Sequence, residues 1–288
     1  MIYHMLNLNT KYSGYKTVDV NDPNVANLYG DKTTNWFDLL ENQYIIITEN
    51  NLPIDKYKWQ DGKHKNVFKK PIESLVMGKV KAKNIEQELA LDMLMDDTTT
   101  VKVMSGCFGS GKTILACAYC MGMLSEGKFE KIMWVRNNIE VKDSNSIGFL
   151  KGDFNDKMAV WAAPLSDHLG GKEMLDALIE RGQIEIEHLG FLRGRDIKHT
   201  IIFCSEAEHL TREHVQLLLG RVAEGSILIL EGDCSQIDAK AFRDDNGLEA
   251  AINCLKGERL FSYVHLKESV RSETAKLADK LNIKGENK

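Results

Sequence analysis

The feature that most restricts the fold of this chain is an eight-residue stretch, Gly106-Cys-Phe-Gly-Ser-Gly-Lys-Thr113, which matches the pattern G-x-x-x-x-G-K-[ST] in full. It follows a β-favouring run at residues 101–105 and opens a helix-length segment, the order that a phosphate-binding loop requires. Glycines let successive backbone N–H groups point inward, and the start of the helix adds partial positive charge. The expected nucleotide contacts are Gly106, Gly109, Ser110, Gly111, Lys112 and Thr113.

Two side chains at the end of this loop have separate expected roles. Lys112 is expected to reach the β- and γ-phosphate oxygens as a catalytic residue, and Thr113 is expected to hold Mg²⁺. The sequence therefore predicts a site for a nucleoside triphosphate, with ATP and Mg²⁺ as the cofactors.

Short β-favouring runs alternate with helix-length or irregular segments through most of the chain. The runs are residues 101–105, 131–135, 184–188, 200–204 and 227–231. Near-continuous apolar strands separated by helices are typical of a parallel sheet that helices cover on both faces. We therefore expect an α/β fold of the P-loop NTPase class with a mostly parallel sheet.

The N-terminal part of the chain has a different character. Residues 1–30 are rich in Asn, Tyr and Gly and show no sustained period, so they are interpreted as an extension of uncertain order. A compact β-favouring run at 44–48, followed by a turn signal, predicts a small β module over 31–75. The remaining residues, 76–288, are assigned to the nucleotide-binding domain.

Composition excludes several classes of protein. A chain of 288 residues with 43% hydrophobic residues can bury a sizeable core, and it contains no apolar run long enough to span a membrane. Its six cysteines lie mostly in apolar segments, which favours reduced thiols in a cytoplasm. The net charge of −5 gives no global electrostatic reason to bind nucleic acid. A lysine-rich run at 63–83 could contact nucleic acid, although a solvated linker is the commoner role.

Polar residues follow the apolar strand at 200–204, where P-loop enzymes keep their Mg²⁺ and water-activating acids. Glu206 is expected to be the general base that orients the attacking water. Ser205 stands where a metal-side Asp is usual, so it is expected to contact Mg²⁺ only through a bound water. This substitution leaves the rate of hydrolysis open.

Two further segments supply candidate ligands. The strand at 227–231 runs into Gly232, Asp233 and Gln236, at the sheet edge where open α/β sheets bind ligands. Asp233 is expected to bind nucleotide, and Gln236 is interpreted as a sensor of the γ-phosphate. Gln87 could offer a donor and an acceptor to adenine, although a helix glutamine is more often merely solvated.

Together these segments resemble the PhoH family, cytoplasmic ATPases whose core is similar to the first motor domain of superfamily 1 helicases. The resemblance spans about residues 83–281. It rests on Lys83-Asn84-Ile-Glu-Gln87, Arg136-Asn137-Asn-Ile-Glu140 with Gly148 to Asp153, Phe191-Leu-Arg193-Gly194-Arg195, Ser205-Glu-Ala-Glu208, Gly232-Asp233 with Gln236-Ile-Asp238, and Ser269-Val-Arg271. The first of these resembles the adenine-reading segment of the family and strengthens the assignment of Gln87.

The resemblance implies an ATPase that assembles as a ring, with a hexamer favoured, and an arginine supplied by the neighbouring subunit. Arg271 is the favoured arginine finger, a catalytic role, with Arg193, Arg195 and Arg221 as alternatives. Where the family has D-E-A-Q, this chain has Ser205 and Glu208, and the second change is expected to add negative charge near the phosphates. Longer relatives carry a PIN nuclease domain, for which residues 1–30 are too few, so no nuclease activity is expected from this chain.

Three functions remain open on sequence alone. The favoured one is a motor or remodeller on single-stranded nucleic acid, RNA rather than DNA, and only the resemblance supports that substrate. A nucleotide-dependent scaffold that hydrolyses ATP slowly is the main alternative, because of Ser205. A small-molecule kinase is the third.

Overall fold

The computed structural model describes residues 12–137, 162–237 and 240–270. Within them, six parallel strands form the central sheet in the order β12-β7-β11-β10-β8-β9. The strands are β7 (Val101–Gly106), β8 (Lys131–Arg136), β9 (Ile184–His188), β10 (Thr200–Cys204), β11 (Ile227–Gly232) and β12 (Phe261–Leu266). The all-parallel sheet confirms the predicted fold class. Strands β10 and β11 are buried along their whole length, as their apolar sequences require.

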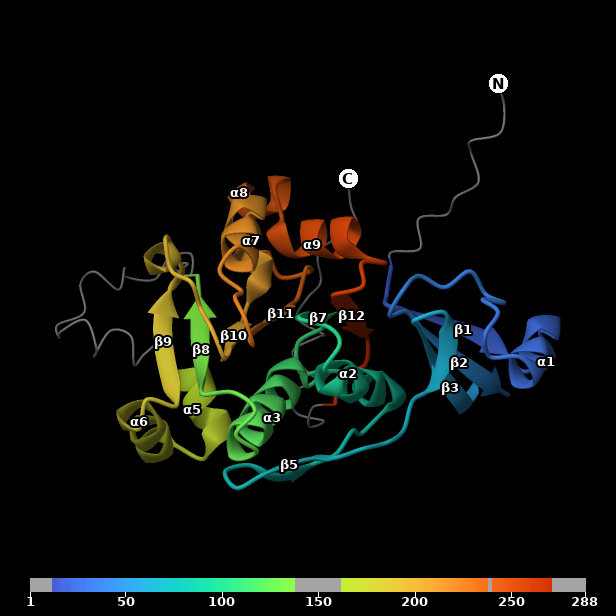
Figure 1. Cartoon of the computed structure of the whole chain (residues 1–288), viewed down its shortest axis with the longest axis horizontal. Helices are drawn as coiled ribbons and strands as arrows, with labels where there is room; N and C mark the ends of the chain where they lie inside the picture. Colours follow the sequence, from blue (N-terminus) through green and yellow to red (C-terminus); the bar gives the residue numbers. More distant parts are fainter. Residues whose placement is uncertain (1–11, 138–161, 238–239, 271–288) are drawn as a thin grey trace, which may run out of the picture.

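Helices cover both faces of this sheet (Figure 1). One face carries α2 (Ile85–Met95), α3 (Lys112–Ser125), α5 (Ala163–Leu169) and α6 (Lys172–Glu180), and the other carries α7 (Arg212–Leu219), α8 (Lys240–Asp244) and α9 (Gly247–Leu255). Short 3₁₀ turns follow β9 at Leu189–Leu192 and β10 at Ala207–His209. Successive strand residues point to opposite faces of the sheet. In β8, Trp134 packs in the apolar core on the side of α2 and α3, and Met133 packs in the core on the side of α7 and α9.

The N-terminal module is larger than the sequence predicts. Strands β1 (Tyr15–Asp19), β2 (Tyr44–Glu49), β3 (Leu52–Gln60) and β4 (Lys63–Asn66) form one sheet, with α1 (Pro23–Gly30) beside it. Residues 15–30 therefore belong to the module, and the expected extension of uncertain order over 1–30 is wrong for them. The physical reason is length: a five-residue strand and an eight-residue helix are too short to show a sustained period.

The boundary predicted at residue 75 falls inside a two-stranded hairpin, β5 (Ile72–Ser74) and β6 (Gly78–Val80). Strand β5 packs directly on α3: a Cβ added at Gly122 would lie 3.1 Å from a methyl carbon of Ile72. This part of the lysine-rich run is thus fixed to the domain that contains the central sheet. Lys69 also pairs with Glu88 on α2, at 2.9 Å. The run is therefore not a free linker in this part.

Polar contacts join the N-terminal module to the domain that contains the central sheet. The side-chain amide of Asn42 donates to the carbonyl oxygens of Arg259 at 3.0 Å and Phe261 at 2.9 Å, at the start of β12. The Tyr44 hydroxyl donates to Asp92 on α2 at 2.9 Å, and Tyr44 shares an apolar core with α2. Helix α2, which bears Gln87, is therefore held between the module and the central sheet.

Candidate nucleotide site

The glycine-rich loop runs from the end of β7 into the start of α3, as the sequence predicts. Gly111 has a φ of 94°, and a Cβ there would lie 2.7 Å from the side-chain nitrogen of Gln87. Gly106 has a φ of 155°, and a Cβ there would lie 2.2 Å from the carbonyl oxygen of Leu266. Only glycine satisfies both the backbone conformation and the close approach at these two positions. The loop therefore has the cradle that a phosphate group fits.

Lys112 is buried at the base of this loop. Its ammonium group donates to the carbonyl oxygens of Gly106 at 2.8 Å and Cys107 at 3.1 Å. A buried cation with neutral partners costs solvation energy, which an anion in the loop would recover. The residues present thus fit a phosphate ligand.

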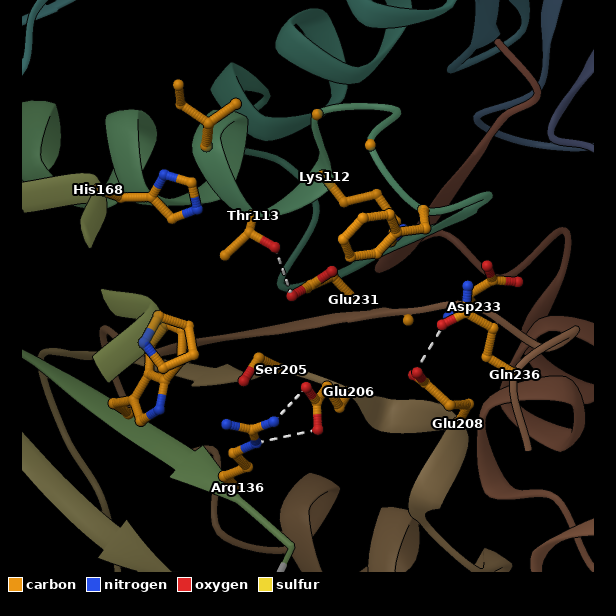
Figure 2. Close-up of a pocket in the computed structure, with 17 residues that line it drawn as sticks. Lys112, Thr113, Arg136, His168, Ser205, Glu206, Glu208, Glu231, Asp233 and Gln236 are labelled. Atoms are coloured by element: carbon orange, nitrogen blue, oxygen red, sulfur yellow. Dashed lines mark hydrogen bonds and ion pairs between the residues drawn. The ribbon is translucent and has the colours of Figure 1, made fainter. Parts of the chain in front are cut away.

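A cleft of about 410 Å³ lies at the carboxyl ends of β7, β8, β10 and β11. Figure 2 shows the side chains that converge on it. Of the predicted site residues, the structure brings together Gly109, Gly111, Lys112, Thr113, Ser205, Glu206, Asp233 and Gln236 along its walls. Open α/β sheets bind their ligands at this edge, so the location agrees with the expected site.

Gln87 lies beside the loop rather than among the residues that line the cleft. Its side-chain nitrogen donates to the carbonyl oxygen of Ser110 at 2.8 Å, and its oxygen accepts from the backbone N–H of Lys83 at 2.8 Å. One amide hydrogen and one lone pair are left for another partner. Contact with adenine therefore stays a prediction, and support of the loop backbone is an additional role that the sequence did not indicate.

Glu206 is held by Arg136, the last residue of β8. The Arg136 Nε donates to one carboxylate oxygen at 3.0 Å, and Nη2 contacts the other oxygen. Glu206 also has a left-handed backbone, with a φ of 53°, which costs about 1 kcal/mol for a residue with a Cβ. Strain of this kind is retained where the surroundings fix it, often at functional sites. The sequence marked Arg136 only as part of a family segment.

Glu231 also lines the cleft, although the sequence analysis assigned it no role. It ends the apolar run of β11, is 4% exposed, and its Oε1 accepts a hydrogen bond from the Thr113 hydroxyl at 3.0 Å. Burial raises the pKa of this carboxyl, which the Lys112 charge and the Thr113 hydrogen bond oppose. A charged residue inside an otherwise apolar strand was the available signal.

The family model described as "PhoH-like protein" matches residues 79–281 of this chain. The chain belongs to the PhoH family. Protein PhoH2 of Bacillus subtilis is 31% identical over 285 residues, covering 93% of this chain and 63% of that protein. A PhoH-like protein of the same organism is 35% identical over 165 residues. That alignment covers 56% of this chain and 50% of the other protein. The chain thus spans half to two thirds of these curated PhoH relatives.

A solved structure of the Pif1 helicase from Candida albicans is similar to part of this PhoH-family chain. The match covers 70% of this chain and 44% of the helicase chain. The TM-score is 0.37 and the identity 15%, values too low to support a functional comparison. Among the described residues, none of the helices combines the length and the apolar character needed to cross a bilayer.

The two departures from the PhoH pattern D-E-A-Q, Ser205 and Glu208, both line the cleft. Ser205 is buried, as is Glu208, whose Oε2 accepts a hydrogen bond from the backbone N–H of Asp233 at 3.1 Å. Burial raises the pKa of Glu208 to about 8, so most of this carboxyl is protonated at neutral pH. With this raised pKa, Glu208 adds less negative charge near the phosphates at neutral pH than the sequence predicts, and in its protonated form it resembles Gln.

The candidate arginine fingers have different environments. Arg195 pairs with Glu185 at 2.8 Å and Glu187 at 2.5 Å, and Arg221 donates to the carbonyl oxygen of Arg195 at 3.0 Å. These contacts give both residues a structural role within their own chain. Arg193 is exposed, and Arg271 lies outside the described residues. The residue before it, Val270, donates its backbone N–H to Gly109 of the phosphate loop at 2.9 Å.

Proposed function

We propose that this chain binds ATP with Mg²⁺ in the cleft and hydrolyses it, and that hydrolysis drives remodelling of single-stranded nucleic acid by a ring of subunits. The observation that carries the ATPase assignment is the convergence of Lys112, Thr113, Glu206 and Gln236 on one cleft. Few other tasks need a phosphate cradle, a metal-binding hydroxyl and a carboxylate in one place. RNA as the substrate, the hexameric ring and an arginine from a neighbour rest on membership of the PhoH family.

The side chains divide the work of phosphoryl transfer. Lys112 binds the β- and γ-phosphate oxygens, and the glycine-rich loop aligns the triphosphate. Mg²⁺, when bound at Thr113, supplies positive charge to the phosphates. The water oxygen bonds to the γ-phosphorus, the bond from that phosphorus to the β–γ bridging oxygen breaks, and Glu206 takes the proton. Gln236 lines the cleft beside Asp233, and we assign it the role of sensing loss of the γ-phosphate (Figure 2).

An exposed aromatic residue next to two lysines forms a patch that fits a nucleic-acid strand. Phe68 is 62% exposed and stands next to Lys69 and Lys70, so its ring can stack on a base while the cations meet phosphates. The other candidates, Trp36 and Trp59, pack against the core of the module. Phe68 with its two lysines therefore becomes the preferred contact for single-stranded nucleic acid.

The test is the rate of ATP hydrolysis with and without single-stranded RNA and DNA, on protein whose oligomeric state has been measured. We expect RNA to raise the turnover of the wild type more than DNA does, and Phe68→Ala to remove that stimulation without changing the basal rate. Leu75→Ala, which removes a side chain that is even more exposed (94%) but has no aromatic ring, is the control. Stimulation by neither polymer would contradict the nucleic-acid part of the proposal and leave the ATPase part standing.

Ser205 supports a second candidate, a scaffold that assembles on ATP and hydrolyses it slowly. A serine hydroxyl carries no charge to offer a metal-bound water. ATP binding without turnover in the wild type, with turnover gained in Ser205→Asp, would favour the scaffold. Repeated turnover with water as the sole acceptor would exclude a small-molecule kinase as the main activity.

A further inference from the structure

We infer that Glu231 supplies the metal-side carboxylate that this chain lacks at Ser205. The inference rests on the proposed ATP site and deepens it, because it assigns a Mg²⁺-binding role to a residue on the neighbouring strand. P-loop NTPases hold Mg²⁺ with the hydroxyl of the loop and an acid after a nearby strand. In this chain the acid lies on β11, the strand next to β10.

The strand register places the two positions side by side. Cys204, the last residue of β10, pairs with Leu230 of β11; Ser205 follows β10 directly, and Glu231 is the next residue of β11. Glu231 in turn pairs with Met104 on β7, the strand that leads into the phosphate loop. Paired residues on parallel strands point to the same face of a sheet. A carboxylate at 231 therefore enters the same part of the cleft as one at 205 would (Figure 2).

The contact with Thr113 fixes the direction of the carboxylate. Glu231 Oε1 accepts from the Thr113 hydroxyl at 3.0 Å, so the two groups expected to share a cation already face one another. Burying a carboxylate in an apolar strand is costly unless it is paired or binds a metal. Residues 227–230 of the same strand are apolar and buried, so packing alone would favour another aliphatic side chain at 231.

The other acids of the cleft have different partners. Both oxygens of Glu206 contact Arg136, and Glu208 accepts from the backbone of Asp233. Asp233 Oδ1 accepts from the backbone and hydroxyl of Ser235, at 2.9 and 2.6 Å. Among the acids that line the cleft in the described residues, Glu231 is therefore the one that faces the metal-binding hydroxyl.

The described residues contain no group of three or more His, Cys, Asp or Glu side chains that could hold a metal by themselves. Two protein groups, Glu231 and Thr113, leave most of the coordination sphere of Mg²⁺ to phosphate oxygens and water. Cation binding at this site is therefore expected to depend on the nucleotide.

The test is the affinity for Mn²⁺, measured by electron paramagnetic resonance in the presence of saturating ADP. We expect Glu231→Gln to weaken Mn²⁺ binding by at least about tenfold, the scale seen when groups around a metal are removed. ADP affinity in EDTA should stay within about twofold, because Gln keeps an oxygen to accept from Thr113. Glu88→Gln, an acid on α2 paired with Lys56 and Lys69, is the matched control.

A rescue variant separates a metal role from a packing role. We expect Ser205→Asp added to Glu231→Gln to restore Mn²⁺ affinity, because it returns the carboxylate to the neighbouring strand. Unchanged Mn²⁺ affinity in Glu231→Gln, with normal ADP binding in EDTA, would overturn the assignment of Glu231 alone. Failure of the wild type to bind ADP in EDTA would overturn the nucleotide site itself, and with it this inference.

Discussion

Arg136 holds both carboxylate oxygens of Glu206, with Nε donating to Oε2 at 3.0 Å and Nη2 in contact with Oε1. The pair links the end of β8 to the residue after Ser205, across the floor of the cleft (Figure 2). It fixes a carboxylate that is 44% exposed and would otherwise rotate in solvent. If Glu206 is the general base that we propose, it must be aimed at its proton, and the pair with Arg136 fixes that aim.

Replacing Arg136 should therefore slow hydrolysis. We expect Arg136→Gln to lower kcat by about tenfold or more, with little change in ATP affinity, because a base displaced by even 1 Å loses much of its effect. Arg136→Lys should rescue poorly, since an ammonium cannot make two parallel hydrogen bonds to a carboxylate. Steady-state ATPase assays and equilibrium binding separate the two parameters. A faster Arg136→Gln enzyme would show instead that the pair restrains Glu206.

Glu208 should make the stability of the protein depend on pH. An unfolded glutamate titrates near 4.5 and the folded one near 8, so between these values the folded state keeps a proton that the unfolded state has lost. The free energy of unfolding therefore falls as the pH rises through this window, and the loss is complete above the folded pKa. We expect Glu208→Gln to remove a decline of ~4 kcal/mol between about pH 5 and pH 9.

Urea unfolding of the wild type and Glu208→Gln across this pH range measures the effect, and the difference between the two proteins cancels the contribution of other groups. Gln keeps an oxygen for the backbone N–H of Asp233, so the native contact is retained. Parallel pH profiles for the two proteins would mean that Glu208 titrates normally in the folded state.

Glu86 should join three parts of the protein: the N-terminal module, helix α2 and the segment after β12. Its carboxylate accepts from the Tyr15 hydroxyl of the module at 2.7 Å and from the backbone N–H groups of Lys267 and Glu268 at 2.6 and 3.1 Å. Glu86→Gln keeps one oxygen for the two backbone N–H groups but places an uncharged NH2 group at the Tyr15 hydroxyl, so the contacts lose the strength that a charged acceptor gives them. We expect a loss of about 1–3 kcal/mol in the free energy of unfolding by urea. Glu88→Gln, at a more exposed position of α2, should cost less, and an equal cost would contradict this role.

Gln87 should set the preference for adenine. If its remaining donor and acceptor read the base, Gln87→Ala lowers the affinity for ATP by more than the affinity for GTP or inorganic triphosphate. If it serves only to hold the carbonyl of Ser110, all three ligands should weaken equally. Competition binding with the three ligands distinguishes these outcomes, and we expect the first.

The sequence was sufficient for the strand, loop and helix around Lys112, because that motif depends on local backbone geometry and on residues adjacent in the chain. Five of the six strands of the parallel sheet were predictable for a similar reason, since each is a short β-favouring run. Strand β12 was missed, because Ser262 and His265 interrupt its apolar residues. Glu231 and Arg136 were not assigned roles, because their partners, Thr113 and Glu206, are distant in sequence and are brought near by strand order. The first strand and helix of the module were missed because each is too short to show periodicity.

Hydrolysis of ATP in this cleft is tested most directly by turnover measured beside ATP binding for the wild type, Lys112→Ala and Glu206→Gln. We expect repeated turnover in the wild type, loss of binding and turnover in Lys112→Ala, and intact binding in Glu206→Gln with turnover reduced at least about a hundredfold, the usual contribution of a general base. Wild-type protein that binds ATP without turning it over, or a Glu206→Gln variant as fast as the wild type, would contradict the claim.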